Sequence, residues 1–222
     1  MSVYRITTLF CLKVMSIYAL ATCLTSCATS GGYDLTPEEK ALINSADSIM
    51  RVLTTESEAD MVVLRDTSTD LSASSLMSDE FRRLSGLMIS TVTHPSQDGV
   101  GIAAPQVGLN RRVIAVQRFD KAADSLGNHP FETYANIRLI SASDSLAPGS
   151  EGCLSVPGRH GEVLRSQSVV IEYADMAALE KLTVRKGEGT IPVIRETVSG
   201  FTAVIFQHEI DHLDGILYID RL

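Results

Sequence analysis

Apolar residues with helical spacing mark two parts of the chain. In the first, they recur every three or four positions at Phe81, Leu84, Leu87, Met88 and Val92. This spacing predicts a helix over 78–93 that packs on a core. The second helical pattern starts at about Thr197 and continues through His208 and His212, close to the C-terminus.

Between these helices the apolar residues form short runs typical of buried strands. They occupy 113–116, 137–140 and 169–173, and we expect the last of these to pair with 182–184. Residues 119–135 are predicted as an exposed excursion, 147–150 as a turn and 185–189 as a loop. Strands gathered before a final helix indicate an α+β fold with antiparallel or mixed sheets around that helix.

The region before the first of these helices is more polar. Residues 28–35 are predicted as a tether. Thr36 and Pro37, followed by two acids, are typical of a helix start, and we predict a helix from there to about Leu53. Residues 54–75 are rich in Ser, Thr and Asp and are predicted as loop around the apolar run 61–64.

The first 27 residues have the features of a bacterial signal peptide. Arg5 and Lys13 are basic, an apolar run covers 14–24, and no acid precedes Asp34. The run ends in Leu-Thr-Ser-Cys, which is similar to the lipoprotein signal in which the cysteine, here Cys27, is lipidated after cleavage. An ordinary secretory signal or a retained membrane anchor are the alternatives.

The cysteine count and the net charge limit the disulfides and the binding partners that the mature chain can have. Two of the four cysteines precede Cys27, so Cys153 alone would remain in the folded body and could form no internal disulfide. Metal ligation explains such a cysteine in an exported protein. The formal charge of −8 argues against a nucleic-acid-binding surface, which needs a clustered basic face.

The chemistry is concentrated in the pattern His208-Glu209-Ile210-Asp211-His212. On a helix, two histidines four positions apart lie on one face and can bind a single metal ion. Glu209 is placed to act as general base toward a water at that metal. The alternative is that the two histidines lie on an ordinary helix by chance and bind no metal.

A catalytic metal of this kind takes three protein ligands and leaves a position for water. Only ten residues follow His212, and the position that holds a third histidine in one class of proteases is Tyr218. The third ligand is therefore expected upstream, with Cys153 as the best candidate. His94, His129 and His160 compete with it, but each is better explained as an exposed loop or turn residue.

Residues 99–108 contain two alternate glycines but lack the third glycine of a dinucleotide loop. We interpret them instead as a segment where backbone approaches a ligand closely, next to the amide of Gln106. A loop-stabilising role for Gln106 stays open, since many buried amides only serve backbone groups.

Three segments together, 99–106, 151–155 and 207–215, resemble in order the three signature motifs of peptide deformylases. The resemblance covers roughly residues 60–222. It implies a peptide-deformylase-like catalytic domain over 58–222, preceded by the signal (1–27) and by a tether and helix (28–57).

The resemblance also implies a mechanism and a set of site residues. Cys153, His208 and His212 would hold one divalent metal, with Fe(II) expected as the native ion and Zn(II) or another divalent ion as alternatives. Glu209 would serve as base, while Gln106 and the backbone N–H of Leu154 would stabilise an oxyanion. The substrate would be an N-formylmethionyl peptide, bound along the following residues: Gly99, Val100, Gly101, Phe201, Val204 and Ile205.

Some features depart from the family pattern and keep alternatives open. The loop before the final helix, around 185–196, is longer than usual. A lipoprotein of the cell envelope would also face away from cytoplasmic ribosomes, where nascent chains are deformylated; the location is cytoplasmic if 1–27 is no working signal. The alternative functions are an envelope metallopeptidase or amidase with the same metal chemistry, and a non-enzymatic lipoprotein that retains the fold.

Overall fold

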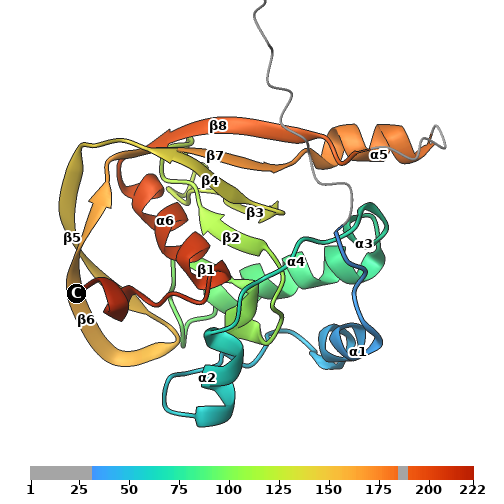
Figure 1. The fold of residues 1–222 in the computed structure, drawn as a ribbon, viewed down its shortest axis with the longest axis horizontal. Coiled ribbons are helices and arrows are strands. Elements are labelled where there is room, and N and C mark those ends of the chain that lie inside the picture. Colours follow the sequence, from blue (N-terminus) through green and yellow to red (C-terminus); the bar gives the residue numbers. More distant parts are fainter. Residues whose placement is uncertain (1–31, 185–189) are drawn as a thin grey trace, which may run out of the picture.

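The computed structural model describes residues 32–184 and 190–222 (Figure 1). The helices are α1 (Pro37–Ser45), α2 (Glu58–Leu64), α3 (Ala73–Leu76), α4 (Asp79–Val92), η1 (Ala104–Val107), α5 (Met176–Val184), α6 (Phe201–Leu213) and η2 (Tyr218–Arg221). The strands are β1 (Gly101–Ala103), β2 (Val113–Gln117), β3 (Phe131–Ala135), β4 (Arg138–Ala142), β5 (Leu146–Cys153), β6 (Val156–Ser166), β7 (Ser168–Ala174) and β8 (Val193–Ser199). The predicted signal and lipidation site lie outside the described residues.

The strands form three antiparallel sheets around α6 (Figure 1). Their orders are β1-β2-β3, β4-β7-β8 and β5-β6. Ten of the thirteen residues of α6 are buried, since sheets surround the helix on several sides. The α+β fold with a central C-terminal helix is therefore confirmed.

Two apolar clusters hold this arrangement. One joins α4 to the first sheet and includes Leu84, Met88 and Ile102. The other joins α6 to strands of the first and second sheets and includes Phe206 and Ile210. The helix predicted over 78–93 is confirmed as α4, with Ser78 as its N-cap and its apolar face buried.

The N-terminal part differs from the prediction in several places. The chain is already packed at Leu35, which is only 3% exposed. Helix α1 begins at Pro37 with a complete capping box but ends at Ser45, well before the predicted Leu53. Small polar residues follow Leu42 and compete with the helical hydrogen bonds, and the Ser45 hydroxyl donates to the Leu42 carbonyl.

The predicted loop over 54–75 in fact contains two helices. Ser57 caps α2 and Ser72 caps α3, each accepting a hydrogen bond from a backbone N–H three residues on. The serines that suggested a loop are therefore helix caps.

The strands at 113–116 and 137–140 are confirmed as β2 and β4, with β4 starting one residue later and ending two residues later than predicted. The excursion is shorter than predicted because Phe131–Ala135 form β3 along β2. The turn predicted at 147–150 is wrong: these residues belong to β5, where Pro148 lies opposite Leu164 in a two-stranded sheet that tolerates proline at its edge. The chain turns instead at Leu154 and Ser155.

The strand at 169–173 is confirmed as β7, but its predicted partner is wrong. It pairs with β4 and β8, while 182–184 lie in α5, which is rich in good helix formers. Strand β8 runs to Ser199, so α6 starts at Phe201 instead of Thr197, after Gly200 at φ 67°.

The predicted loop 185–189 lies outside the described residues. No helix in the described part of the chain is long and apolar enough to cross a bilayer.

Candidate metal centre

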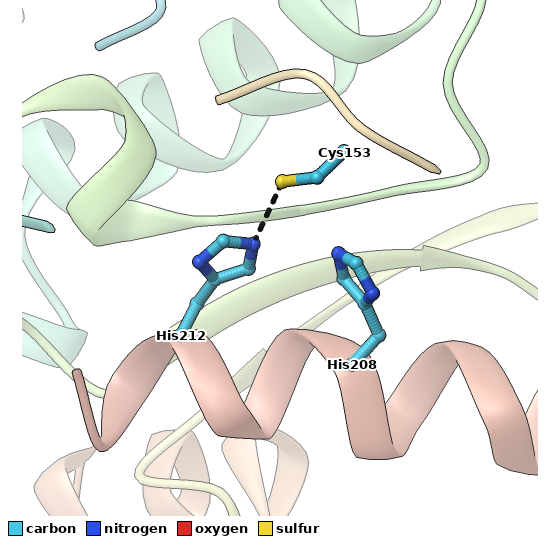
Figure 2. Close-up of side chains that lie close together, drawn as sticks. All are labelled: Cys153, His208 and His212. Atoms are coloured by element: carbon cyan, nitrogen blue, oxygen red, sulfur yellow. Dashed lines mark hydrogen bonds between the residues drawn. The ribbon is translucent and has the colours of Figure 1, made fainter. Parts of the chain in front are cut away.

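The three predicted ligands lie together between α6 and the end of β5 (Figure 2). His208 and His212 are one turn apart on α6, and Cys153 is the last residue of β5. Their ligand atoms lie within 4.8 Å of one another, and Cys153 Sγ is 3.2 Å from His212 Nε2. One thiolate and two imidazoles within this distance are a donor set that would hold a divalent transition-metal ion.

His208 is oriented from behind by a buried chain of charges. Its Nδ1 lies 2.8 Å from a carboxylate oxygen of Glu151 on β5. Arg165 of β6 binds Glu151 through two hydrogen bonds of 2.8 and 3.0 Å, and donates a third, of 2.5 Å, to Asp211. A carboxylate on the second nitrogen of a metal-binding histidine fixes the ring and makes it a stronger ligand.

The two histidines lie in different electrostatic surroundings. Burial lowers the pKa of His208, but hydrogen bonds with Cys153 and Glu151 outweigh this effect and raise it to about 10. A cation bound beside Cys153 would replace this proton, since a ligating histidine is neutral. Burial and the charges of His208 and Arg165 hold the pKa of His212 well below its usual value. His212 is thus neutral, as a metal ligand must be.

Glu209 lies beside the ligands on α6. Its side chain is buried, and its Oε2 has no hydrogen-bond partner among the described residues. Burial raises the pKa of Glu209 to about 7. A carboxyl group with a pKa near neutrality can both take up and release a proton, as a general base requires.

Gly101 of β1 passes directly over Glu209. A Cβ atom at position 101 would lie 2.5 Å from Glu209 Oε1 and 2.8 Å from Ile205 Cγ2. Any larger residue would push the carboxylate aside, so a glycine is needed here for β1 to lie against Glu209. The predicted close approach of this backbone to a ligand stays a prediction.

The side-chain amide of Gln106 contacts both its own loop and the metal ligands. Its Oε1 accepts a hydrogen bond of 2.8 Å from the Ala103 N–H, which stabilises the loop. This contact turns Nε2 toward the metal ligands, 3.1 Å from Ser155 Oγ and 3.5 Å from Cys153 Sγ. The amide is therefore held with its donor facing the site.

A cavity of about 340 Å³ opens in front of the ligands. Its lining includes every residue predicted for substrate binding or oxyanion stabilisation: Gly99, Val100, Gly101, Gln106, Leu154, Phe201, Val204 and Ile205. The cavity has a polar end at Glu209 and Gln106 and an apolar wall along the first turns of α6. Such a shape suits a polar reacting group that carries an apolar side chain.

The other histidines do not join the ligand cluster. His94 is bound to the Ser96 hydroxyl and His129 to the Lys121 carbonyl. His160, predicted as an exposed turn residue, is exposed but lies on strand β6 opposite Gly152, and it lines the cavity.

Sequence reasoning assigned no role to four residues around the site. Glu151 and Arg165 orient His208, and Asp98 lines the cavity. Tyr218, noted only as the residue in place of a third histidine, stacks on His208 with ring centroids 6.1 Å apart and packs near Cys153. Glu151 could have been found from its place two residues before Cys153, whereas Arg165 had no local signal.

Comparison with known proteins gives one consistent result. Residues 49–222 match the family model described as polypeptide deformylase. The chain is 34% identical over 162 residues to the peptide deformylase of Leptospira biflexa, covering 72% of this chain and 82% of that protein. It is also 34% identical over 175 residues to that of Caulobacter vibrioides, covering 79% and 88%.

Solved structures agree. A Met-Ala-Ser-bound class I type b peptide deformylase from Acinetobacter baumannii superimposes with a TM-score of 0.63 at 29% identity, covering 78% of this chain and 98% of that one. The enzyme from Thermotoga maritima gives 0.61 at 27% identity, covering 79% and 99%. With the family model, the fold and the ligand cluster in agreement, the chain belongs to the peptide deformylase family and is a metal-dependent hydrolase whose metal site is Cys153, His208 and His212.

Proposed function

We propose that this deformylase removes the formyl group from N-formylmethionyl peptides, releasing formate and a free amino terminus. The cavity carries the proposal, because it leads from the metal ligands along an apolar wall formed by Phe201, Val204 and Ile205. The Acinetobacter baumannii relative binds Met-Ala-Ser, which is a deformylated peptide of this kind.

In the proposed reaction, the water and the formyl group would be activated at the cation, and the side chains around it would transfer the proton. Cys153, His208 and His212 would hold a divalent cation, which would supply polarisation of the formyl carbonyl and acidification of water. Glu209 takes the proton from the attacking water as the new C–O bond forms. It then delivers that proton to the methionine nitrogen as the formyl C–N bond breaks.

Two donors would stabilise the negative charge on the formyl oxygen. Gln106 Nε2 already faces the site, because the Ala103 N–H holds the amide oxygen on the other side. The backbone N–H of Leu154 follows ligand Cys153 directly in the turn between β5 and β6. Donors that are fixed before the reaction lower its barrier without further reorganisation.

The substrate would lie as an extended strand along Gly99, Val100 and Gly101. Its methionine side chain would then contact Val204 and Ile205 on the apolar wall of the cavity. We propose Fe(II) as the native ion, with Zn(II) as an alternative; a ligand set of one thiolate and two imidazoles suits both.

Purified protein loaded with Fe(II) under anaerobic conditions is expected to release formate from formyl-Met-Ala-Ser. A chelator should abolish the release, and added Fe(II) or Zn(II) should restore it, since catalysis needs the cation. Formate is measured with a coupled dehydrogenase assay. Cleavage inside unformylated peptides, without formate release, would contradict the proposal and favour the metallopeptidase alternative.

We further propose that the protein is a lipoprotein of the bacterial cell envelope, anchored through Cys27. The basic residues, the apolar run and the Leu-Thr-Ser-Cys sequence support this location. The substrates would then be formylated peptides that reach the envelope, not nascent chains on the ribosome.

Cells grown with a radioactive or clickable fatty acid should label the wild-type protein but not the Cys27→Ser variant. Labelling is read on a gel after immunoprecipitation, with Cys153→Ser as a matched control that keeps the signal cysteine. Equal labelling of wild type and Cys27→Ser, or wild-type protein found only in the cytosol with residues 1–27 intact, would contradict the anchor.

A further inference from the structure

Phe201, the first residue of α6, connects the apolar wall of the cavity to two further rings outside it. Phe201 lines the cavity and is 57% exposed. Its ring centroid lies 5.2 Å from that of Phe119, with the planes tilted by 51°. The Phe119 ring in turn lies 5.1 Å from the His129 ring, tilted by 50°. We call these three residues the aromatic strip.

The two outer residues of the aromatic strip come from the excursion between β2 and β3. Both ends of this excursion are tied at Arg118, whose side chain is 1% exposed. Its N–H donates to the Pro130 carbonyl at 2.8 Å, and its guanidinium binds both carboxylate oxygens of Asp120 at 2.8 and 2.7 Å. The Lys121 carbonyl lies 2.9 Å from His129 Nδ1 and fixes that ring.

The same arginine connects the excursion to the start of α6. Arg118 binds Glu196 of β8 at 2.5 Å, and β8 leads through Gly200 directly to Phe201. Removal of the Asp120 or the Glu196 carboxylate would leave the buried Arg118 guanidinium with less compensating charge, which would destabilise the folded protein. The three rings are therefore held relative to one another from both sides of the aromatic strip.

We propose that the aromatic strip is a substrate-binding surface that receives an apolar side chain of the peptide beyond its formylmethionine. Phe119 and His129 are then specificity-determining residues supplied by the excursion. This inference rests on the proposed function, because it assigns part of the same peptide. The strip is continuous with the methionine wall, and large rings that stay partly in water gain most from contact with an apolar group.

The dimensions of the strip suit a peptide. An extended chain advances about 3.3 Å per residue, so the two residues after methionine reach about 3–7 Å further. Phe201 lies about 5.4 Å, one helical turn, from the Val204 and Ile205 positions. The Phe119 ring is another 5.2 Å away. A side chain one or two residues after methionine can therefore contact Phe201 and Phe119.

The test uses two peptide series, formyl-Met-X-Ser and formyl-Met-Ala-X, with X as Leu, Phe, Gly or Asp. The full-length protein is loaded with Fe(II), and kcat and KM are measured for wild type, Phe119→Ala and His129→Ala. Leu126→Ala is the matched control, since Leu126 lies in the same excursion and is 84% exposed.

Wild type and Leu126→Ala are expected to prefer Leu and Phe over Gly and Asp in at least one series. Phe119→Ala should reduce that preference by about 3- to 10-fold, mainly through KM, as for the loss of one aromatic contact. His129→Ala should reduce it in the same direction by less, because it supports Phe119 from outside.

Three results would overturn the inference. One is a wild-type enzyme that deformylates all eight peptides equally well; this result needs no variant and leaves the proposed function intact. Another is an equal loss of kcat/KM on all peptides in Phe119→Ala and His129→Ala, which would indicate a purely structural role. The last is no formate from any peptide, which alone would also contradict the proposed function.

Discussion

Glu209→Gln is expected to lower kcat for formate release by about 10²- to 10⁴-fold, the usual contribution of a general acid–base group. The amide has nearly the same shape as the carboxylate but cannot accept the proton of the attacking water. Because the ligands are Cys153, His208 and His212, the variant should keep its metal. Single-turnover formate assays and metal analysis on the same sample measure both effects.

Glu162→Gln is the matched control for this substitution, because Glu162 lies on β6 and does not line the cavity. It should keep wild-type activity. Full activity in metal-loaded Glu209→Gln would exclude Glu209 as the base. Loss of the metal from this variant would instead indicate that the carboxylate contributes to binding of the ion.

Arg165→Met is expected to lower the free energy of unfolding by about 3–5 kcal/mol, as for removal of one partner from a buried ion pair. The side chains of Arg165 and Glu151 are 4% and 5% exposed, so Glu151 would lose its main compensating charge. Because Glu151 orients His208, metal affinity should also fall, by about 10- to 100-fold. Urea unfolding of the metal-free protein and competition with a metal-binding dye measure the two changes.

Arg195→Met provides the control for the loss of an arginine ion pair. Arg195 binds Glu172 at 2.6 Å, but its side chain is 54% exposed. An exposed pair of this kind contributes about 0–1 kcal/mol, and no change in metal affinity is expected. Equal destabilisation by the two substitutions would show that burial of the Arg165 network does not determine its contribution.

The sequence was most informative where spacing alone dictates geometry. Two histidines four residues apart must share a helix face, and His208 and His212 do so on α6. The elimination of a downstream ligand pointed to Cys153, which lies 3.2 Å from His212 although 59 positions separate them. The apolar spacing from Phe81 to Val92 likewise predicted α4 because that helix buries one face.

The sequence was less informative where contacts distant in the chain decide the structure. Ser57 and Ser72 suggested a loop because a serine is equally common in loops and at helix caps, and only the hydrogen bond distinguishes the two. Pro148 suggested a turn, although an edge strand also accepts it. Arg165 could not be recognised as part of the site, because its partners Glu151 and Asp211 are 14 and 46 positions away.

The division of the ligands between β5 and α6 makes the cation a cross-link of the chain. Cys153 ends strand β5, whereas His208 and His212 lie on α6, which all three sheets surround. A bound ion would therefore connect two elements that come together only when the chain folds. An ion that binds only the folded form adds its binding free energy to folding. Binding of the metal is therefore expected to stabilise the fold as well as to support activity.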